Sequence, residues 1–263
     1  MLANRLRAGQ KGILLMADYD NRVLNAQAGT AGAVDAGLRS YMLRVYNYML
    51  VGLVLTGVAA YLVADVPSVR ALFFAYNETT GRMGMTILGW IALFAPFGLV
   101  LLMSFGQSRM SYGTAQIVFW VYAALMGISL APIVLIYTGA SIATTFFITA
   151  GTFGAMSLYG YTTGRDLTGF GSFLFMGLIG IVIASLVNIW LQSAMMSFVV
   201  SIIGVLVFTG LTAYDTQQIK NGYWAGADAQ TAGKNAIFGA LRLYLDFINL
   251  FLFILRLFGG QRR

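Results

Sequence analysis

Residues 210–220 read Gly-Leu-Thr-Ala-Tyr-Asp-Thr-Gln-Gln-Ile-Lys, and the carboxylate in this stretch, Asp215, ends an apolar run that begins at Ala194. A second carboxylate, Asp246, lies inside the next apolar run, at residues 236–258. Placing a carboxylate at membrane depth costs roughly 3 kcal/mol or more on insertion scales. Two such residues on consecutive hydrophobic segments indicate a functional site, and the rest of the chain can be interpreted as the scaffold that holds them.

The composition is typical of a polytopic membrane protein. Of 263 residues, 59% are hydrophobic and only 10% are charged, whereas soluble domains carry about 25% charged residues. Cysteine and histidine are both absent, which excludes disulfides, thiolate nucleophiles, metal sites built on either residue and the usual pH switch near neutrality. If the protein senses pH or moves protons, carboxylates must do so.

The sequence contains none of the common catalytic motifs. It has no glycine-rich phosphate loop, no serine nucleophile elbow and no HExxH motif, so we expect no enzymatic activity and no cofactor. The net charge of +7 could suggest a nucleic-acid partner. Basic residues gather beside the hydrophobic segments, however, where they determine topology. We therefore expect the lipid bilayer, and no nucleic acid, as the partner of these charges.

Apolar runs predict an all-α bundle of seven transmembrane helices. Each run is close to the roughly 20 residues that cross about 30 Å of hydrocarbon. The predicted spans are 42–64, 84–104, 115–137, 141–163, 170–191, 194–214 and 236–258. Two polar stretches, 65–83 and 216–235, are predicted to be loops. In the fourth span, Gly151, Gly154 and Ala155 are expected to pack against a neighbouring helix, because small residues let membrane helices approach closely.

The basic residues predict a cytoplasmic N-terminus. Residues 1–40 are predicted to form a polar cytoplasmic tail, 41–260 the membrane domain, and 261–263 a basic tail. Alternating the faces gives a basic excess on the N-terminal side, which the positive-inside rule assigns to the cytoplasm. That side carries Arg5, Arg7, Lys11, Arg22, Arg39, Arg44, Arg109, Arg165, Lys220 and Lys234, and the other Arg70, Arg82, Arg256, Arg262 and Arg263. A full seventh crossing places the basic tail outside, whereas a re-entrant seventh run returns it to the cytoplasm.

The two carboxylates can meet if the sixth helix continues past Asp215 through Lys220. Carboxylates in contact cannot easily both ionise, so they titrate as a coupled pair and can sense pH without histidine. Asp215 and Asp246 are also hard oxygen ligands suited to Ca²⁺. Two acids are too few for a tight calcium site, so we expect weak or transient binding.

Other polar residues gather around the pair. Arg242 and Asn249 lie four residues before and three residues after Asp246, and therefore share its helix face. Arg109, after the second span, could reach Asp215 as a latch. Simpler interpretations stay open: Asp215 marks the end of a span, Asp246 forms a structural salt bridge with Arg242, and Arg109 is an ordinary positive-inside residue. Asn188 in the fifth span is more readily an interhelical hydrogen-bonding residue than a ligand.

The chain resembles the Bax inhibitor-1/YccA family, also called the transmembrane BAX inhibitor motif family. The resemblance covers roughly residues 40–260. It rests mainly on Thr-Ala-Tyr-Asp-Thr-Gln-Gln-Ile-Lys at 212–220 and Leu-Tyr-Leu-Asp-Phe-Ile-Asn-Leu-Phe at 243–251. Gly-Ile-Ser-Leu-Ala-Pro-Ile-Val at 127–134 and Arg-Leu-Phe-Gly at 256–259 add support.

The resemblance implies an inner-membrane protein with seven helices, the last one central, and a pH-sensitive calcium leak governed by a di-aspartyl sensor. Asp215 and Asp246 match the two sensor aspartates by motif, and Arg109 matches by position the arginine that engages them. Bacterial members are also associated with a membrane-bound ATP-dependent protease, which the N-terminal tail could contact. The leading hypothesis is thus a Ca²⁺-permeable channel or leak. A non-conducting protein that modulates proteolysis or stress survival is the alternative, and a proton-coupled transporter is disfavoured because no inverted repeat is evident.

Overall fold

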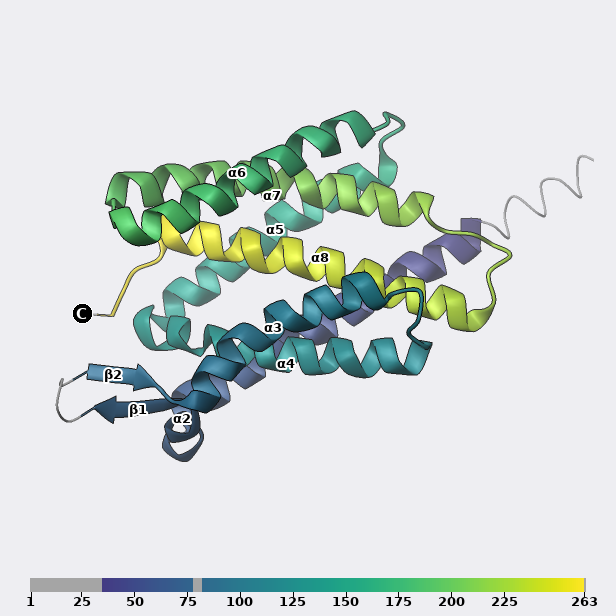
Figure 1. The fold of residues 1–263 in the computed structure, drawn as a ribbon. Coiled ribbons are helices and arrows are strands. Elements are labelled where there is room, and N and C mark those ends of the chain that lie inside the picture. The colour runs from purple at the N-terminus through teal and green to yellow at the C-terminus, as the bar shows by residue number, and fades with distance from the viewer. Residues whose placement is uncertain (1–34, 78–81, 263) are drawn as a thin grey trace, which may run out of the picture.

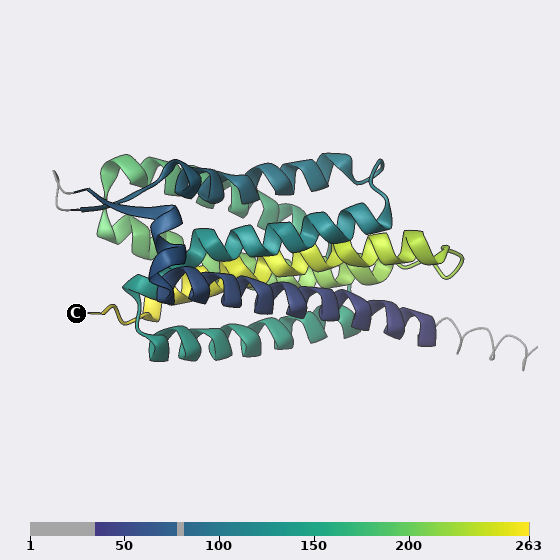
Figure 2. The same cartoon turned by 90° about the horizontal axis from the view of Figure 1, so that it is seen from below.

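The computed structural model describes residues 35–77 and 82–262, and the fold in these ranges is a helical bundle (Figures 1 and 2). Within them, seven helices are long and apolar enough to cross a membrane. They are Asp35–Asp65, α3 (Ile87–Gly106), α4 (Tyr112–Ile136), α5 (Gly139–Thr162), α6 (Thr168–Leu191), α7 (Ala194–Asn221) and α8 (Ala229–Phe258). The predicted all-α transmembrane bundle is confirmed.

The N-terminal third differs from the prediction at two places. The first helix begins at Asp35, inside the segment predicted to be tail, and residues 1–34 of that tail lie outside the described residues. The loop predicted at 65–83 contains a short helix, α2 (Pro67–Phe73), and an antiparallel hairpin of β1 (Phe74–Asn77) and β2 (Arg82–Met85). Pro67 at the start of α2 has the backbone φ that a first helical turn requires.

Helices α7 and α8 both extend beyond their apolar runs. The prediction of a loop at 216–235 is therefore wrong in its bounds, because only residues 222–228 separate the two helices. With 28 and 30 residues, they reach about 42 and 45 Å at 1.5 Å per residue. This length exceeds the hydrocarbon thickness, so their ends form polar helical turns that hydropathy alone cannot distinguish from a loop. Asp228 begins α8 by accepting hydrogen bonds from the backbone N–H groups of Gln230 and Thr231.

Helix α8 is the centre of the bundle. Its most apolar window is 72% buried, against 17% to 39% for the other six spans, and it packs against α4, α5 and α7. It is one continuous helix that runs from the α7–α8 loop to the end of the bundle where the C-terminus lies (Figure 1). The seventh run is thus one unbroken helix long enough for a full crossing, without the break that a re-entrant run would need.

The C-terminal tail is attached to the turn between α4 and α5. Thr138 N–H donates to the carbonyl of Gly260 at 3.1 Å, and Arg262 N–H donates to the carbonyl of Ile136 at 2.8 Å. The tail and this turn therefore lie at the same end of the bundle, opposite the α7–α8 loop.

The close helix approaches occur at different glycines from those predicted. A Cβ added at Gly151 or Gly154 would meet open space, so the packing expected there is not found. On the same helix, a Cβ at Gly160 would overlap the backbone carbonyl of Ala213 on α7, and one at Gly127 of α4 would overlap the carbonyl of Thr56 on the first helix. These two positions need glycine because backbone, which cannot move aside easily, lies against them.

Candidate functional site

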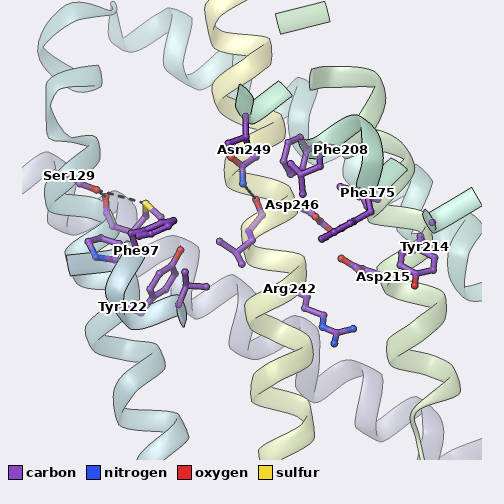
Figure 3. A pocket seen from close by; sticks show the side chains of 18 of the residues that line it. Phe97, Tyr122, Ser129, Phe175, Phe208, Tyr214, Asp215, Arg242, Asp246 and Asn249 are labelled. Atoms are coloured by element: carbon purple, nitrogen blue, oxygen red, sulfur yellow. Dashed lines mark hydrogen bonds between the residues drawn. The ribbon is translucent and has the colours of Figure 1, made fainter. Parts of the chain in front are cut away.

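A cavity of about 950 Å³ lies against the central helix, at the level of the two aspartates. Its floor comes from α7 and α8, and its walls come from α3, α4 and α6 (Figure 3). Asp215, Asp246, Arg242 and Asn249 all line it. The structure thus brings together four of the five polar residues that the sequence analysis proposed for the site, and the fifth is Arg109.

Helices α7 and α8 bring the two carboxylates to each other. Asp215 projects from α7 and Asp246 from α8 (Figure 3), and their carboxyl groups lie close enough for each to affect the ionisation of the other. The condition that the sequence set for this approach is met, because α7 continues as a helix past Asp215 to Asn221. Asp246 is only 4% exposed, and its Oδ2 atom has no hydrogen-bond partner in the described structure. A buried carboxylate oxygen without a partner is costly, and such groups concentrate at functional sites.

Arg242 is the cation that lies beside the pair. Figure 3 shows its guanidinium on the side of both carboxylates that faces the α7–α8 loop. Arg242 also lines a second cavity, of about 230 Å³, together with Gln107, Gln218 and Asn235. That cavity lies at the end of the bundle formed by the α3–α4 turn and the α7–α8 loop. Arg242 therefore stands between the carboxylate cavity and this end of the molecule.

The structure does not bring Arg109 to the aspartates. Arg109 is exposed in the turn between α3 and α4, and it is absent from the described lining residues of both cavities. Helix α3 continues to Gly106, so the turn that carries Arg109 begins beyond the level of the pair. Among the described lining residues of the carboxylate cavity, the cation is Arg242.

The polar residues that follow Asp215 fasten α7 to its neighbours. Gln217 accepts a hydrogen bond from Leu167 N–H at 2.8 Å and donates one to the carbonyl of Arg165 at 2.7 Å. Lys220 donates to the carbonyl of Tyr161 at 2.8 Å, and its ammonium lies over the Tyr161 ring. These contacts hold the α5–α6 connection against α7 and fix the helix that presents Asp215.

A chain of hydroxyl groups connects the same part of α7 to α5 and the first helix. Tyr46, Ser157 and Thr216 lie in series, with oxygen separations of 2.6 and 2.9 Å. Thr216 donates its own proton to the carbonyl of Thr212, so Ser157 donates to Thr216 and Tyr46 donates to Ser157. Thr216, the neighbour of Asp215, is thus held in one orientation by hydrogen bonds that lead to α5 and to the first helix.

Sequence reasoning did not identify the walls of the cavity. Phe97 and Pro96 come from α3, Tyr122 from α4 and Phe175 from α6. Aromatic and aliphatic residues at these positions look the same in sequence as those that face lipid. Pro96 was the one signal available, because a proline inside a membrane helix is often found beside a cavity or a partner helix.

The site could hold a calcium ion only loosely. Within the described residues, no group of three or more Asp, Glu, His or Cys side chains could hold a metal ion. Ca²⁺ takes six to eight oxygen ligands, so an ion at Asp215 and Asp246 would keep much of its water. Asn249 adds an amide on the same helix face. Its Nδ2 donates to the carbonyl of Leu245 at 2.8 Å, and its Oδ1 is the atom that could bind an ion.

Asn188 has the structural role that the sequence favoured. Its Nδ2 donates to Ser197 Oγ at 2.7 Å, and its Oδ1 accepts from the backbone N–H of Ser193 at 3.0 Å. These bonds close the turn between α6 and α7, and the interhelical interpretation is confirmed.

Comparison with known proteins shows which family the chain belongs to. A family profile described as "Inhibitor of apoptosis-promoting Bax1" matches residues 38–263, which include every helix of the bundle that reaches the cavity. The chain belongs to the Bax inhibitor family. Among its relatives, the uncharacterized protein RP147 of Rickettsia prowazekii is 53% identical over 228 residues, which cover 87% of this chain and 92% of the relative. The inner membrane protein YbhL of Escherichia coli K12 is 51% identical over 229 residues, which cover 86% of this chain and 94% of the relative. The family assignment predicted from the two aspartate motifs is confirmed.

Proposed function

We propose that this Bax inhibitor family protein is a pH-sensitive, Ca²⁺-permeable leak whose sensor is the pair of Asp215 and Asp246. The observation that carries the proposal is the neighbouring position of two acids at the floor of a cavity, one of them with an unpartnered buried oxygen. Two adjoining carboxylates cannot easily both ionise in such surroundings. The pair therefore exists in two charge states, and a change of pH can select between them.

Arg242 provides a physical reason for a closed state. A guanidinium between the carboxylate cavity and the second cavity opposes a divalent cation at that point, as fixed positive charges do in other pores. When the aspartates share a proton, the cavity holds little negative charge and Ca²⁺ has no reason to enter it. When both are ionised, they attract Ca²⁺ and also draw Arg242 toward themselves, out of the connection between the two cavities.

The location of the protein follows from the same reasoning. Because YbhL is named as an inner membrane protein, we propose a multi-pass inner-membrane location. The end of the bundle that carries Arg39, Arg109, Arg165, Lys220 and Lys234 is proposed to face the cytoplasm. Within the described residues this end has more basic residues than the other, which carries Arg70, Arg82, Arg256 and Arg262.

The decisive experiment measures Ca²⁺ influx into proteoliposomes loaded with a calcium-sensitive dye, while the external pH is varied. We expect wild-type protein to give a pH-dependent leak, and Asp215→Asn and Asp246→Asn to shift or abolish the pH dependence. Asp166→Asn is the matched control, because Asp166 is an exposed carboxylate in the α5–α6 connection and should leave the profile unchanged.

Two outcomes would move the interpretation elsewhere. If folded wild-type protein passes no Ca²⁺ at any pH, the leak proposal fails and a non-conducting regulator of a membrane protease or a stress response becomes the better hypothesis. Deleting residues 1–34 tests that alternative directly, since loss of the tail should spare ion flux but abolish a function that depends on a tail-bound partner. Saturable transport of an organic substrate would instead favour a proton-coupled transporter.

A further inference from the structure

The cavity has a polar floor and largely apolar side walls. Asp215, Asp246 and Arg242 lie on α7 and α8, at the floor. The walls on α3 and α6 carry mainly hydrocarbon and aromatic side chains: Leu93, Phe97, Val100, Phe175, Leu178 and Val182. A small hydrated ion would form no favourable polar contacts with these hydrocarbon and aromatic side chains. They suit a ligand that has both a polar head and a hydrocarbon tail.

The walls leave the cavity accessible from the side of the bundle. Helix α3 packs mainly on α4, and α6 packs on α7, but α3 and α6 do not pack closely against each other. Phe97 and Phe175, one on each wall, line the cavity and are still 67% and 59% exposed. In a bilayer these side chains face hydrocarbon, so an amphiphile could move from the lipid into the cavity without passing through water.

The charges at the floor indicate which amphiphile fits. Among the described lining residues, only Asp215, Asp246 and Arg242 are charged. Two negative charges and one positive charge leave one negative charge in the fully ionised state, which is the state that a bound cation would favour. The Oδ2 atom of Asp246 also lacks a hydrogen-bond donor. A ligand that brings one positive charge and an N–H group would satisfy both deficits.

We propose that this cavity binds a lipophilic primary ammonium, with the ammonium on Asp246 and the alkyl chain between α3 and α6. An anionic amphiphile would add a second uncompensated negative charge, and a quaternary ammonium would leave Oδ2 without a donor. The inference rests on the same carboxylate pair as the proposed leak. It requires no conduction, however, and is tested without calcium.

Dodecylammonium is the probe for a direct binding experiment. The full-length protein in nanodiscs of zwitterionic lipid is titrated calorimetrically in calcium-free buffer, and the heat of partition into empty nanodiscs is subtracted. We expect saturable binding at one site per chain. Ethylammonium, dodecanol and dodecyltrimethylammonium should each bind at least about tenfold more weakly, because each lacks the tail, the charge or the N–H donor.

Four variants locate the site. Asp246→Asn keeps the shape of the side chain but removes its charge, and should weaken dodecylammonium binding by about tenfold or more; Asp215→Asn provides a second charge variant if Asp246→Asn does not fold. Phe175→Ala should weaken binding several-fold by removing part of the apolar wall. Phe173→Ala is the matched control, because Phe173 lies on the same helix with 64% exposure but is not among the lining residues, and it should bind as the wild type does.

The results separate this inference from the proposed function. Saturable binding that is weakened by both the charge variant and Phe175→Ala supports the site, whether or not the protein conducts Ca²⁺. Uptake without saturation, or binding equal in wild type and both charge variants, overturns it even if the leak is confirmed. Equal losses in Phe175→Ala and Phe173→Ala would also overturn it, since the tail would then not occupy the cavity.

Discussion

Arg242, which the sequence placed on the same helix face as Asp246, is the cation that the structure places beside the pair. The resemblance to the family assigned the latch to Arg109, but the guanidinium beside the aspartates belongs to the central helix itself. A cation on the same helix as Asp246, one helical turn away, can respond to the ionisation of the pair by moving its side chain alone. No displacement of the α3–α4 turn is needed.

Replacing Arg242 tests this role at the residue scale. Arg242→Gln should raise Ca²⁺ influx several-fold at a pH where wild-type protein leaks slowly, because the positive charge between the two cavities is lost. Arg242→Lys keeps the charge and should remain close to wild type. The measurement is the dye-based influx in proteoliposomes.

Arg109→Gln is the informative comparison for that experiment. From the exposed position of Arg109, we expect its influx to equal that of wild type. A large increase in Arg109→Gln, with none in Arg242→Gln, would show that the latch lies in the α3–α4 turn and that our assignment is wrong.

At the scale of single elements, the contact between α5 and α7 depends on Gly160. Gly160→Ala should destabilise the protein by about 1–3 kcal/mol, because the added methyl group overlaps the backbone carbonyl of Ala213. Gly154→Ala, on the same helix, should be nearly neutral because its Cβ meets open space. Thermal unfolding in detergent, compared for the two variants, checks the prediction; equal stability of both would contradict the close approach.

The start of α8 depends on a carboxylate outside the membrane. Asp228 accepts hydrogen bonds from Gln230 and Thr231, including the Thr231 hydroxyl at 2.7 Å, and these hold the pKa of Asp228 below its usual value. A lowered folded-state pKa means that the stabilisation is complete above the unfolded pKa of about 3.9 and is lost as the pH falls through the folded value. This cap is therefore constant near neutral pH and cannot act as the sensor.

Substitution at Asp228 tests the cap. Asp228→Ala should speed hydrogen exchange of the Gln230 and Thr231 amides, because both lose their acceptor. Asp228→Asn should retain most of the protection, since asparagine is a good N-terminal cap. Similar exchange in the alanine variant and the wild type would show that the first turn of α8 does not need the side chain.

At the scale of the whole molecule, the fold predicts which segments share a side of the membrane. The chain contains no cysteine, so single cysteines can be introduced without background labelling. Ala225→Cys, in the α7–α8 loop, and Gln261→Cys, in the tail, lie at opposite ends of α8. With an impermeant thiol reagent, we expect Ala225→Cys to react only from the cytoplasmic side and Gln261→Cys only from the other side. Labelling of both from one side would rule out a full crossing by α8.

The sequence alone was sufficient for the class of fold and for the aspartates. Seven apolar runs determined seven spans, because a membrane-crossing helix must satisfy its backbone internally and cover its surface with hydrocarbon, and both requirements are visible in composition. Asp215 and Asp246 were evident for the opposite reason: a charge inside an apolar run is costly and therefore rare. Hydropathy failed where helices leave the hydrocarbon, at the start of the first helix, the ends of α7 and α8, and the segment of α2 and the hairpin.

The tertiary structure decided what surrounds the pair. Which cation lies beside Asp215, which glycine meets a backbone, and which aromatic residues form the cavity walls all depend on how the helices are rotated and paired. In a membrane, the lipid-facing and cavity-facing sides of a helix are both apolar, so periodicity does not separate Phe173 from Phe175 or Gly154 from Gly160. Those choices follow from packing between helices, and packing is specified by shape rather than by hydrophobic pattern.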